Sequence, residues 1–262
     1  MKTVNVEGID LVVADAGMGT PVLLVHGFPL NMQMWDAQAD ALEAEHRVIA
    51  VDLRGFGQSE VVESVTMQRF ADDLAVVLDS LGVDEPVAFC GLSMGGYIAW
   101  EFWRRHQGRV AKLILCDTRA AGDTPEAVEG RHELVERIRV EGTSFVPDLM
   151  LPKLLSPETQ RERPHVTEAV AHMIATTHPA GVVAAALGMA QRADSTALLP
   201  TIDAPALLLV GEHDAITSVE EMKQMAAAMP DARLIVIPQA GHMAPMENPA
   251  AVNEAILEFL SE

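Results

Sequence analysis

Short apolar runs alternate with amphipathic helical patterns along most of the chain, and this alternation limits the possible folds more than any other feature. The runs are four or five residues long and rich in leucine and β-branched residues, as in strands buried on both faces. They cover residues 11–14, 22–25, 48–51, 87–90, 113–116, 206–210 and 234–237. Strands that alternate with helices form a mainly parallel sheet covered on both faces, so we predict an α/β fold. Residues 5–13 predict a leading hairpin around Gly8.

The helices between these runs have recognisable start and stop signals. Thr66 is the predicted N-cap of a helix with one apolar face, and Gly82 marks its end. Ser218 and Glu221 have the spacing of a capping box at the start of another helix. Pro249 opens the last helix.

The alternation breaks between about residues 119 and 196. This stretch has helical stripes punctuated by prolines and no strand, and the sheet resumes at Ala206. An all-helical insertion between two strands predicts a cap over one edge of the sheet. We therefore predict a core formed by residues 1–118 and 197–262 and a helical cap formed by residues 119–196.

The formal net charge of −20 argues against a nucleic-acid partner, because an acidic surface repels a phosphate backbone. No apolar run approaches the roughly 20 residues that span a bilayer. The first residues also lack the basic-then-apolar order of a signal peptide. We expect a soluble, cytoplasmic protein without a membrane partner; its oligomeric state stays open.

Two cysteines, Cys90 and Cys116, end predicted strands. Buried thiols of this kind favour a structural role in a reducing compartment. A disulfide between them is the alternative if the two strands are neighbours. No group of cysteines and histidines has the spacing of zinc ligands, so we predict no metal site.

The clearest chemical signal is the sequence Gly91-Leu92-Ser93-Met94-Gly95, which joins a predicted strand directly to a predicted helix. A serine on such a tight turn is held in a strained backbone conformation that exposes its hydroxyl. Side chains at Gly91 and Gly95 would collide with neighbouring backbone. The positive end of the helix points at the hydroxyl, where negative charge develops during acyl transfer. The pattern predicts that Ser93 is a nucleophile; a tight turn with an incidental serine is the alternative.

A serine hydroxyl needs a base, and His242 is the best placed of the nine histidines. It follows a glycine in a loop after the last strand, whereas most other histidines lie in or beside helical patterns. Asp214 follows the preceding strand and would orient the imidazole, giving the chain order Ser, Asp, His. Asp117, directly after another strand, is the alternative acid, and Glu212 is a weaker one.

The developing oxyanion needs two backbone donors. We expect one from the N–H of Met94, directly after the nucleophile, and one from the N–H of Phe28 in the loop after the third strand. A further glycine-rich loop, residues 52–59, lacks the Gly-Lys-Ser/Thr of a phosphate loop. We predict a structural turn there, braced by a pair between Asp52 and Arg54.

Taken together, these residues resemble the α/β-hydrolase superfamily over the whole chain apart from the cap. The matching motifs are His26-Gly27-Phe28-Pro29, Asp52-x-Arg54-Gly55-x-Gly57-x-Ser59, Gly91-x-Ser93-x-Gly95-Gly96, Gly211-x-x-Asp214 and Gly241-His242. The resemblance implies an α/β-hydrolase fold with an eight-stranded, mostly parallel sheet, an inserted helical cap, no cofactor, and the roles already given to Ser93, Asp214 and His242.

Within the superfamily the chain looks most like 3-oxoadipate enol-lactonases, small carboxylesterases and cofactor-free haloperoxidases, on the motifs around Phe28 and Ser93. The resemblance implies a serine esterase or lactonase for a small-molecule substrate, with peracid formation as a side reaction. Serine at position 93 disfavours dehalogenases and epoxide hydrolases, which use aspartate there. Carbon–carbon bond hydrolases share the triad and stay open. A ligand receptor on a retained hydrolase fold is the alternative from another class, and it would be favoured by the loss of a triad member.

The substrate should lie between the edge of the sheet and the cap. An apolar lining is predicted from Leu30, Met150, Met173, Met189 and Met243, with core packing as the alternative for each. Arg119, Arg131 and Arg137 are candidates to bind a substrate carboxylate, although a solvated helix face explains them equally well.

Overall fold

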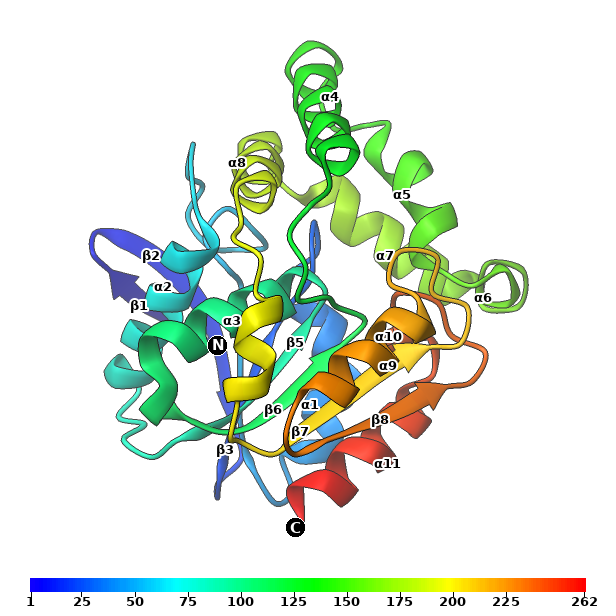
Figure 1. The fold of residues 1–262 in the computed structure, drawn as a ribbon. Helices are drawn as coiled ribbons and strands as arrows, with labels where there is room; N and C mark the ends of the chain where they lie inside the picture. The colour runs from blue at the N-terminus through cyan, green and yellow to red at the C-terminus, as the bar shows by residue number, and fades with distance from the viewer.

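A single sheet runs through the computed structural model, which describes all 262 residues (Figure 1). Every apolar run predicted as a strand lies in it, and residues 2–16 form the predicted hairpin. The strands are β1 (Lys2–Val6), β2 (Ile9–Ala16), β3 (Pro21–Val25), β4 (Arg47–Val51), β5 (Val87–Leu92), β6 (Val110–Cys116), β7 (Ala206–Gly211) and β8 (Ala232–Ile237). The predicted eight-stranded fold is confirmed.

The order of the strands places β3 near the centre of the sheet: β1-β2-β4-β3-β5-β6-β7-β8. The pairs β1–β2 and β2–β4 are antiparallel, and all other neighbours are parallel. The carboxyl ends of six strands, β3 to β8, therefore meet at one edge. Open parallel sheets build their sites at such an edge.

Helices cover both faces of the sheet. Apolar side chains of α2, α3 and α9 share one core cluster with alternate strand residues, and those of α1 and α11 share a second cluster with the others. The helices and 3₁₀ turns are η1 (Met32–Trp35), α1 (Asp36–Leu42), α2 (Met67–Ser80), α3 (Met94–His106), η2 (Gln107–Arg109), α4 (Pro125–Glu141), α5 (Val146–Leu154), α6 (Pro157–Glu162), α7 (Pro164–Thr176), α8 (Pro179–Ala190), η3 (Thr196–Thr201), α9 (Val219–Ala228), α10 (Ala244–Glu247) and α11 (Pro249–Leu260).

The start and stop signals act as the sequence predicts. The Thr66 hydroxyl accepts a hydrogen bond from Arg69 N at 3.1 Å at the start of α2, and Gly82, with φ +66°, follows its end. The Ser218 hydroxyl likewise accepts from Glu221 N at 3.1 Å at the start of α9. Each cap satisfies a backbone donor that the helix itself leaves unpaired.

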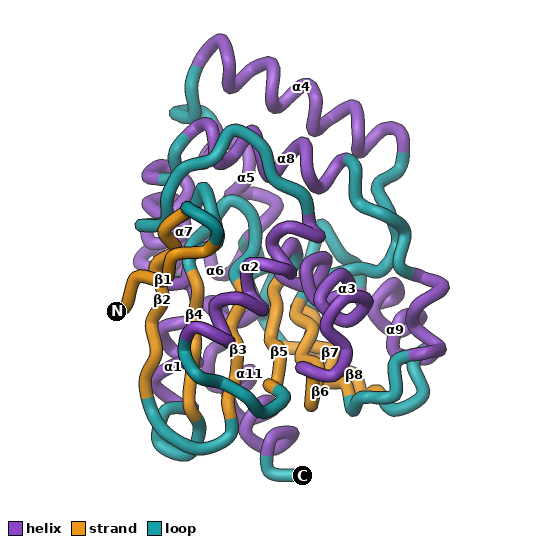
Figure 2. Tube along the Cα trace, turned by 90° about the vertical axis from the view of Figure 1, so that its left-hand side faces the viewer, coloured by secondary structure: helices purple, strands orange, loops and turns teal.

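Five helices, α4 to α8, fill the chain between β6 and β7, where the sequence showed three apolar stripes. The two that it missed, α5 and α6, are short. Each of the five has a proline in its first turn, so most prolines here start helices rather than end them; Pro152 lies inside α5. Both views show α4, α5 and α8 above one end of the strands (Figures 1 and 2). The cap boundaries at residues 119 and 196 stay a prediction.

No single helix has the length and apolar composition to cross a membrane. The pair α7 and α8 reaches that composition only when the two are taken together, and they are bent by 94° at the break between them.

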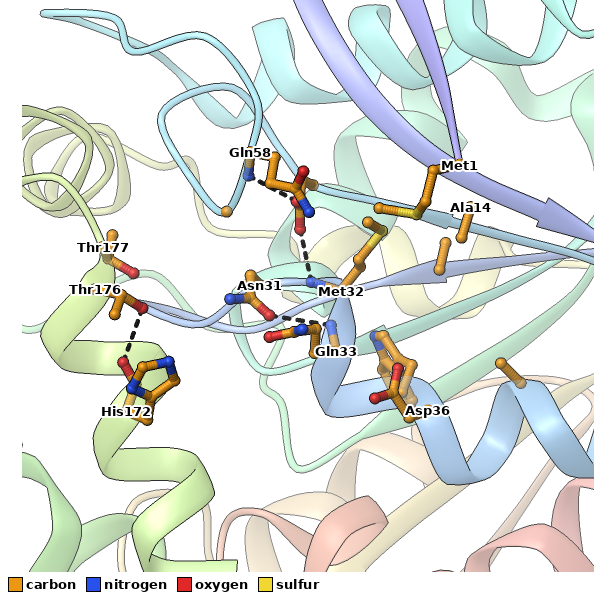
Figure 3. Close-up of a pocket in the computed structure, with 15 residues that line it drawn as sticks. Met1, Ala14, Asn31, Met32, Gln33, Asp36, Gln58, His172, Thr176 and Thr177 are labelled. Carbon is orange, nitrogen blue, oxygen red and sulfur yellow. Dashed lines mark hydrogen bonds between the residues drawn. The ribbon is translucent and has the colours of Figure 1, made fainter.

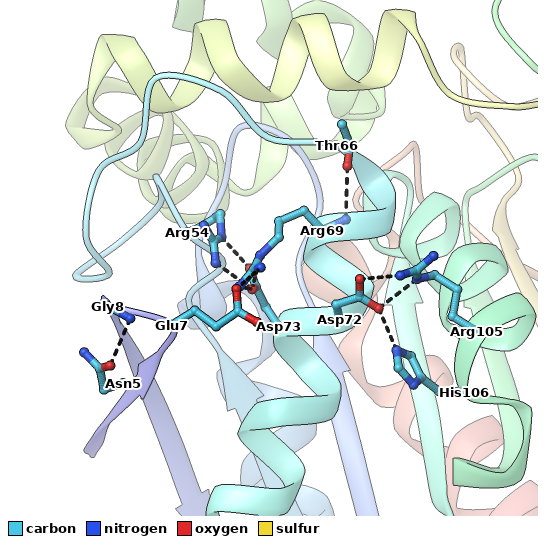
Figure 4. A network of polar contacts seen from close by, with 10 residues as sticks. All are labelled: Asn5, Glu7, Gly8, Arg54, Thr66, Arg69, Asp72, Asp73, Arg105 and His106. Atoms are coloured by element: carbon cyan, nitrogen blue, oxygen red, sulfur yellow. Dashed lines mark hydrogen bonds and ion pairs between the residues drawn. The ribbon is translucent and has the colours of Figure 1, made fainter.

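The glycine-rich turn after β4 is braced differently from the prediction. Arg54 does not pair with Asp52; it extends to helix α2 and makes two hydrogen bonds with Asp73 (Figure 4). The carboxylate of Asp52 instead accepts backbone N–H groups of Met32 at 2.9 Å and Gln58 at 2.8 Å. The predicted pair was wrong. The side chains of Asp52 and Arg54, two residues apart on a sharp turn, bond to different partners, and only the fold brings Asp73 near Arg54.

The Arg54–Asp73 pair is buried, with side-chain exposures of 9% and 1%, so removing one partner leaves the other charge buried and uncompensated. In the variant Asp73→Ala, Arg54 loses its buried counter-charge, and we expect the free energy of unfolding to fall by about 3 kcal/mol. Urea unfolding measures the change. Asp72→Ala on the same helix is the matched control, because its pairs with Arg105 and His106 are more exposed and each worth less than about 1 kcal/mol. Equal losses in the two variants would contradict this account.

Candidate active site

Ser93 lies between β5 and α3 with φ +51° and ψ −106°, a conformation that non-glycine residues rarely adopt. Its neighbours on β6 hold it there. Ser93 N donates to Cys116 O at 2.9 Å, and the Thr118 hydroxyl donates to Ser93 O at 2.7 Å. Such strain persists only where the surrounding structure fixes it. The predicted strained turn is therefore present, and it is maintained by the last residue of β6 and by Thr118 just beyond that strand.

The glycines of this turn leave no room for side chains. A Cβ at Gly91 would lie 2.5 Å from the carbonyl carbon of Gly95, and a Cβ at Gly95 would lie 2.3 Å from Val25 O. The collisions predicted for both positions are confirmed. A Cβ at Gly96 would lie 2.3 Å from the Thr118 hydroxyl oxygen, so the start of α3 packs closely against the side chain of Thr118, just after β6.

His242 and Asp214 are hydrogen-bonded, with 2.8 Å between His242 Nδ1 and Asp214 Oδ2. Both side chains are buried, with exposures of 3% and 0%. The other oxygen of Asp214 accepts backbone N–H groups of Ile216 at 2.7 Å and Thr217 at 3.0 Å, which fixes the carboxylate. When Nδ1 carries the proton of this bond, Nε2 is left as an acceptor.

A buried carboxylate that the sequence analysis missed organises the loop of His242. Glu247, 1% exposed, accepts N–H groups on both sides of the histidine, from Gly241 at 2.8 Å and Met243 at 3.2 Å. Its second oxygen accepts Ser156 N at 2.8 Å, from the segment between α5 and α6. Glu247 stands in a short helix with no sequence signal beyond its position after the histidine, so only the fold reveals its role.

Asp117, the alternative acid, lies beside the pair without bonding to the histidine. One oxygen of Asp117, one of Asp214 and one ring nitrogen of His242 lie within 4.8 Å of one another. Burial, and then the charge of Asp214, raise the pKa of Asp117 well above its ordinary value. A cation would need Asp117 ionised and the His242–Asp214 bond broken, so these donors fit a hydrogen-bonded cluster better than a metal site.

The loop after β3 is fastened through His26, which is fully buried. His26 Nε2 accepts the N–H of Leu53 at 3.1 Å, so Nδ1 carries the proton that it shares with Gly27 O at 2.9 Å. Next along the loop, the N–H of Phe28 makes no hydrogen bond within the protein. The Thr177 hydroxyl, after α7, donates to Pro29 O at 2.9 Å and ties the loop to the helical layer.

The residues predicted to line the pocket fall into two groups. Leu30, Met173 and Met243 are buried in one core cluster and Met150 packs against it, whereas Met189 is buried in the other. A cavity of about 410 Å³ lies nearby, with Asn31 and Gln33 on one side and His172 and Thr176 on the other (Figure 3). Neither Ser93 nor His242 lines it.

The three arginines considered for a substrate carboxylate all have protein partners. Arg119 donates to Ile216 O and lies 3.2 Å from Glu221. Arg131 pairs with Asp123 at 2.5 Å, and Arg137 with Glu141 at 3.0 Å. None of the three is a free anion-binding group.

The sheet with its strained serine and the buried His–Asp pair defines a protein of the hydrolase class. Residues 20–249 match the family profile described as the alpha/beta hydrolase fold. The chain belongs to this family.

Three relatives show where in the family the chain is similar to known proteins. An esterase from Thermogutta terrifontis, solved with malate bound, is 50% identical with a TM-score of 0.95, covering 99% of this chain and 96% of that one. An enol-lactonase from Burkholderia xenovorans is 27% identical with a TM-score of 0.93 over 100% of both chains. 3-Oxoadipate enol-lactonase 1 from Acinetobacter baylyi is 28% identical, covering 82% of this chain and 79% of its own. The predicted resemblance to esterases and enol-lactonases is confirmed, and it supports a hydrolase of esters or lactones.

The close packing of the turn gives a sharp test of Ser93 placement. In Gly95→Ala the new methyl group would meet Val25 O, so the turn must shift, and we expect turnover of ester substrates to fall by about 10²-fold or more. Gly108→Ala is the matched control, because nothing lies within 4 Å of a Cβ there. Initial rates on a chromogenic ester compare the two variants. A Gly95→Ala enzyme as active as the control would show that the turn tolerates displacement.

The buried His26 predicts acid sensitivity. Burial lowers the pKa of His26 below 6.5, so it stays neutral in the fold while the unfolded chain takes up a proton below about that pH. The contribution of neutral His26 to the free energy of unfolding is complete above pH 6.5. It is lost as the pH falls below that value, at up to about 1.4 kcal/mol per pH unit. Urea unfolding from pH 8 to pH 5 measures it, and His26→Gln should flatten the slope. Parallel losses in the two proteins would contradict the assignment.

Proposed function

We propose that the protein is a serine hydrolase that cleaves carboxylic esters or lactones of small molecules through a covalent acyl-enzyme. Ser93 is the nucleophile, His242 the general base and Asp214 the acid that orients it. The observation that carries the proposal is the buried His242–Asp214 hydrogen bond at the edge of the sheet where Ser93 stands in its strained turn. Hydrogen bonds from Ser93 N to Cys116 O, and from Gly211 N to Asp117, link the three strand ends involved.

The first half of the reaction forms the acyl-enzyme. Ser93 Oγ attacks the carbonyl carbon while its proton moves to His242 Nε2, and Asp214 stabilises the imidazolium through Nδ1–H. The N–H groups of Phe28 and Met94 receive the negative charge on the former carbonyl oxygen. Support for Phe28 comes from its unpaired N–H, and for Met94 from its place as the first residue of α3.

The first tetrahedral intermediate then collapses: the bond to the alkoxide breaks, His242 gives its proton to the leaving alkoxide, and the acyl-enzyme remains. In the second half His242 takes a proton from water, which attacks the acyl carbon. Collapse of that second tetrahedral intermediate releases the carboxylic acid and returns the proton to Ser93. Every proton passes between Ser93, His242, water and substrate, so these steps need no cofactor.

The acyl group would lie against the apolar side chains of Leu30, Met150, Met173, Met189 and Met243. Four of them are buried in the two core clusters and Met150 is half-buried, as core packing also predicts, so their contact with the acyl group is proposed from their apolar character alone. The paired arginines favour an uncharged substrate. We also propose a reducing, cytoplasmic location, because Cys90 and Cys116 are buried free thiols on neighbouring strands.

Loss of the nucleophile tests the proposal directly. Ser93→Ala should lower kcat on short and medium 4-nitrophenyl esters by about 10⁴-fold or more, because the acyl-enzyme can no longer form. The exposed Ser64→Ala is the matched control and should behave as the parent. A fluorophosphonate should label the parent and Ser64→Ala, but not Ser93→Ala. Substantial esterase activity in Ser93→Ala would remove Ser93 from the mechanism.

A further inference from the structure

Asp117 is a second carboxyl group buried beside the proposed triad. It follows β6 with φ +47° and is fully buried. Oδ1 accepts Gly211 N at 2.7 Å, at the end of the neighbouring strand β7, whereas Oδ2 has no hydrogen-bond partner. A buried polar atom without a partner costs free energy, so its retention beside His242 calls for an explanation.

The groups that face Asp117 oppose its charge. They come from four elements: Cys116 on β6, Asp214 after β7, His242 after β8, and Glu247 on α10. Of these only His242 can be positive, and its Nδ1 is bonded to Asp214. Asp117 makes no ion pair with an arginine or lysine, and burial, followed by the charge of Asp214, raises the pKa of its carboxyl group well above the ordinary value.

We propose that Asp117 is a reserve acid for His242, a positioning residue whose carboxylate replaces that of Asp214 when the latter is lost. This inference rests on the proposed function. In the parent protein Asp214 orients the imidazole, and Asp117 stays neutral beside it.

The anchoring of Asp117 suits this role. Gly211 N holds one oxygen, and the free oxygen is the one available to a new donor. One oxygen of Asp117 and one ring nitrogen of His242 lie within 4.8 Å of each other, so a movement of about 2 Å brings the carboxyl group into hydrogen-bond range of the ring. Removing the Asp214 side chain vacates that space, and it also removes the charge that, after burial, is the largest cause of the raised pKa of Asp117.

The proton balance is simple. On loss of the Asp214 carboxylate, Asp117 releases its proton to solvent and accepts the hydrogen bond of His242 Nδ1–H. During acyl transfer the proton of Ser93 still goes to Nε2, and the carboxylate of Asp117 stabilises the imidazolium.

Two substitutions of Asp214 distinguish a reserve acid from a merely structural residue. Asp214→Ala opens the space for Asp117, whereas Asp214→Asn fills it with an amide that donates to Nδ1 and holds the wrong tautomer. We expect kcat/KM on a 4-nitrophenyl ester to fall about 10²-fold in Asp214→Ala and about 10⁴-fold in Asp214→Asn. If Asp214 had only a structural role, Asp214→Ala would be less active than Asp214→Asn, because alanine also leaves Ile216 N and Thr217 N without their acceptor.

The double variants complete the experiment. Adding Asp117→Asn to Asp214→Ala should cost a further factor of about 100, whereas adding it to Asp214→Asn should cost less than about threefold. Asparagine can still accept from Gly211 N and is neutral like the protonated acid, so the fold should persist; thermal melting checks this. Equal activity of Asp214→Ala with and without Asp117→Asn would overturn the proposal.

A pH profile gives a readout that needs no double variant. If Asp117 must ionise, the acid limb of kcat/KM in Asp214→Ala should move to higher pH than in the parent, by about one unit or more. If no carboxylate takes over, the imidazolium is less stable and the limb should move to lower pH, which would also overturn the proposal. Failure of the proposed function is separate: it would appear as a folded parent with neither ester turnover nor fluorophosphonate labelling.

Discussion

The backbone of Ser93 in its left-handed conformation is the constraint on which the site depends. The conformation is not favoured locally, and it persists because Cys116 at the end of β6 supplies an acceptor, and Thr118 just beyond it a hydroxyl donor, to the peptide groups of this one residue. Asp117, between these two residues, has a carboxyl group that accepts from the end of β7. The end of β6 thus joins the two parts of the site: it holds the turn of Ser93 on one side and the turn after β7 that leads to Asp214 on the other.

Hydrogen-bond donors are distributed unequally among the buried carboxyl groups of this edge. One oxygen of Asp214 accepts from two backbone N–H groups, and one oxygen of Glu247 likewise accepts from two. Asp117 has one such donor and lies next to Asp214. Burial, and then the charge of Asp214, raise the pKa of Asp117 well above its ordinary value.

Much of this arrangement could be predicted from the sequence. The strands, the hairpin and the capped helices follow from local periodicity and from residues such as Thr66 and Ser218, whose side chains act on the backbone beside them. The positions of Ser93, Asp214 and His242 after their strands predicted that all three lie at one edge of the sheet, because parallel strands share that edge. Their roles stay proposals.

What the sequence could not provide depends on contacts between distant segments. The Arg54–Asp73 pair joins residues from a loop and a helix, and proximity in the sequence had suggested Asp52 instead. Glu247 is bonded to Ser156 across 91 positions, and no local pattern announces it. The short helices α5 and α6 were missed because nine and six residues are too few for a clear apolar period.

The helical layer is fastened to the sheet at the two loops that the proposed chemistry needs. The Thr177 hydroxyl holds Pro29 O in the loop of Phe28, and Ser156 shares the carboxylate of Glu247 with the loop of His242. Substitutions in this layer therefore differ in their effect on the site, according to whether they lie near these two attachment points. Insertions next to Ser156 or Thr177 would disturb the loop of His242 and the loop of Phe28, to which these residues are bonded. An engineer who exchanges this layer between relatives should keep those two attachment points.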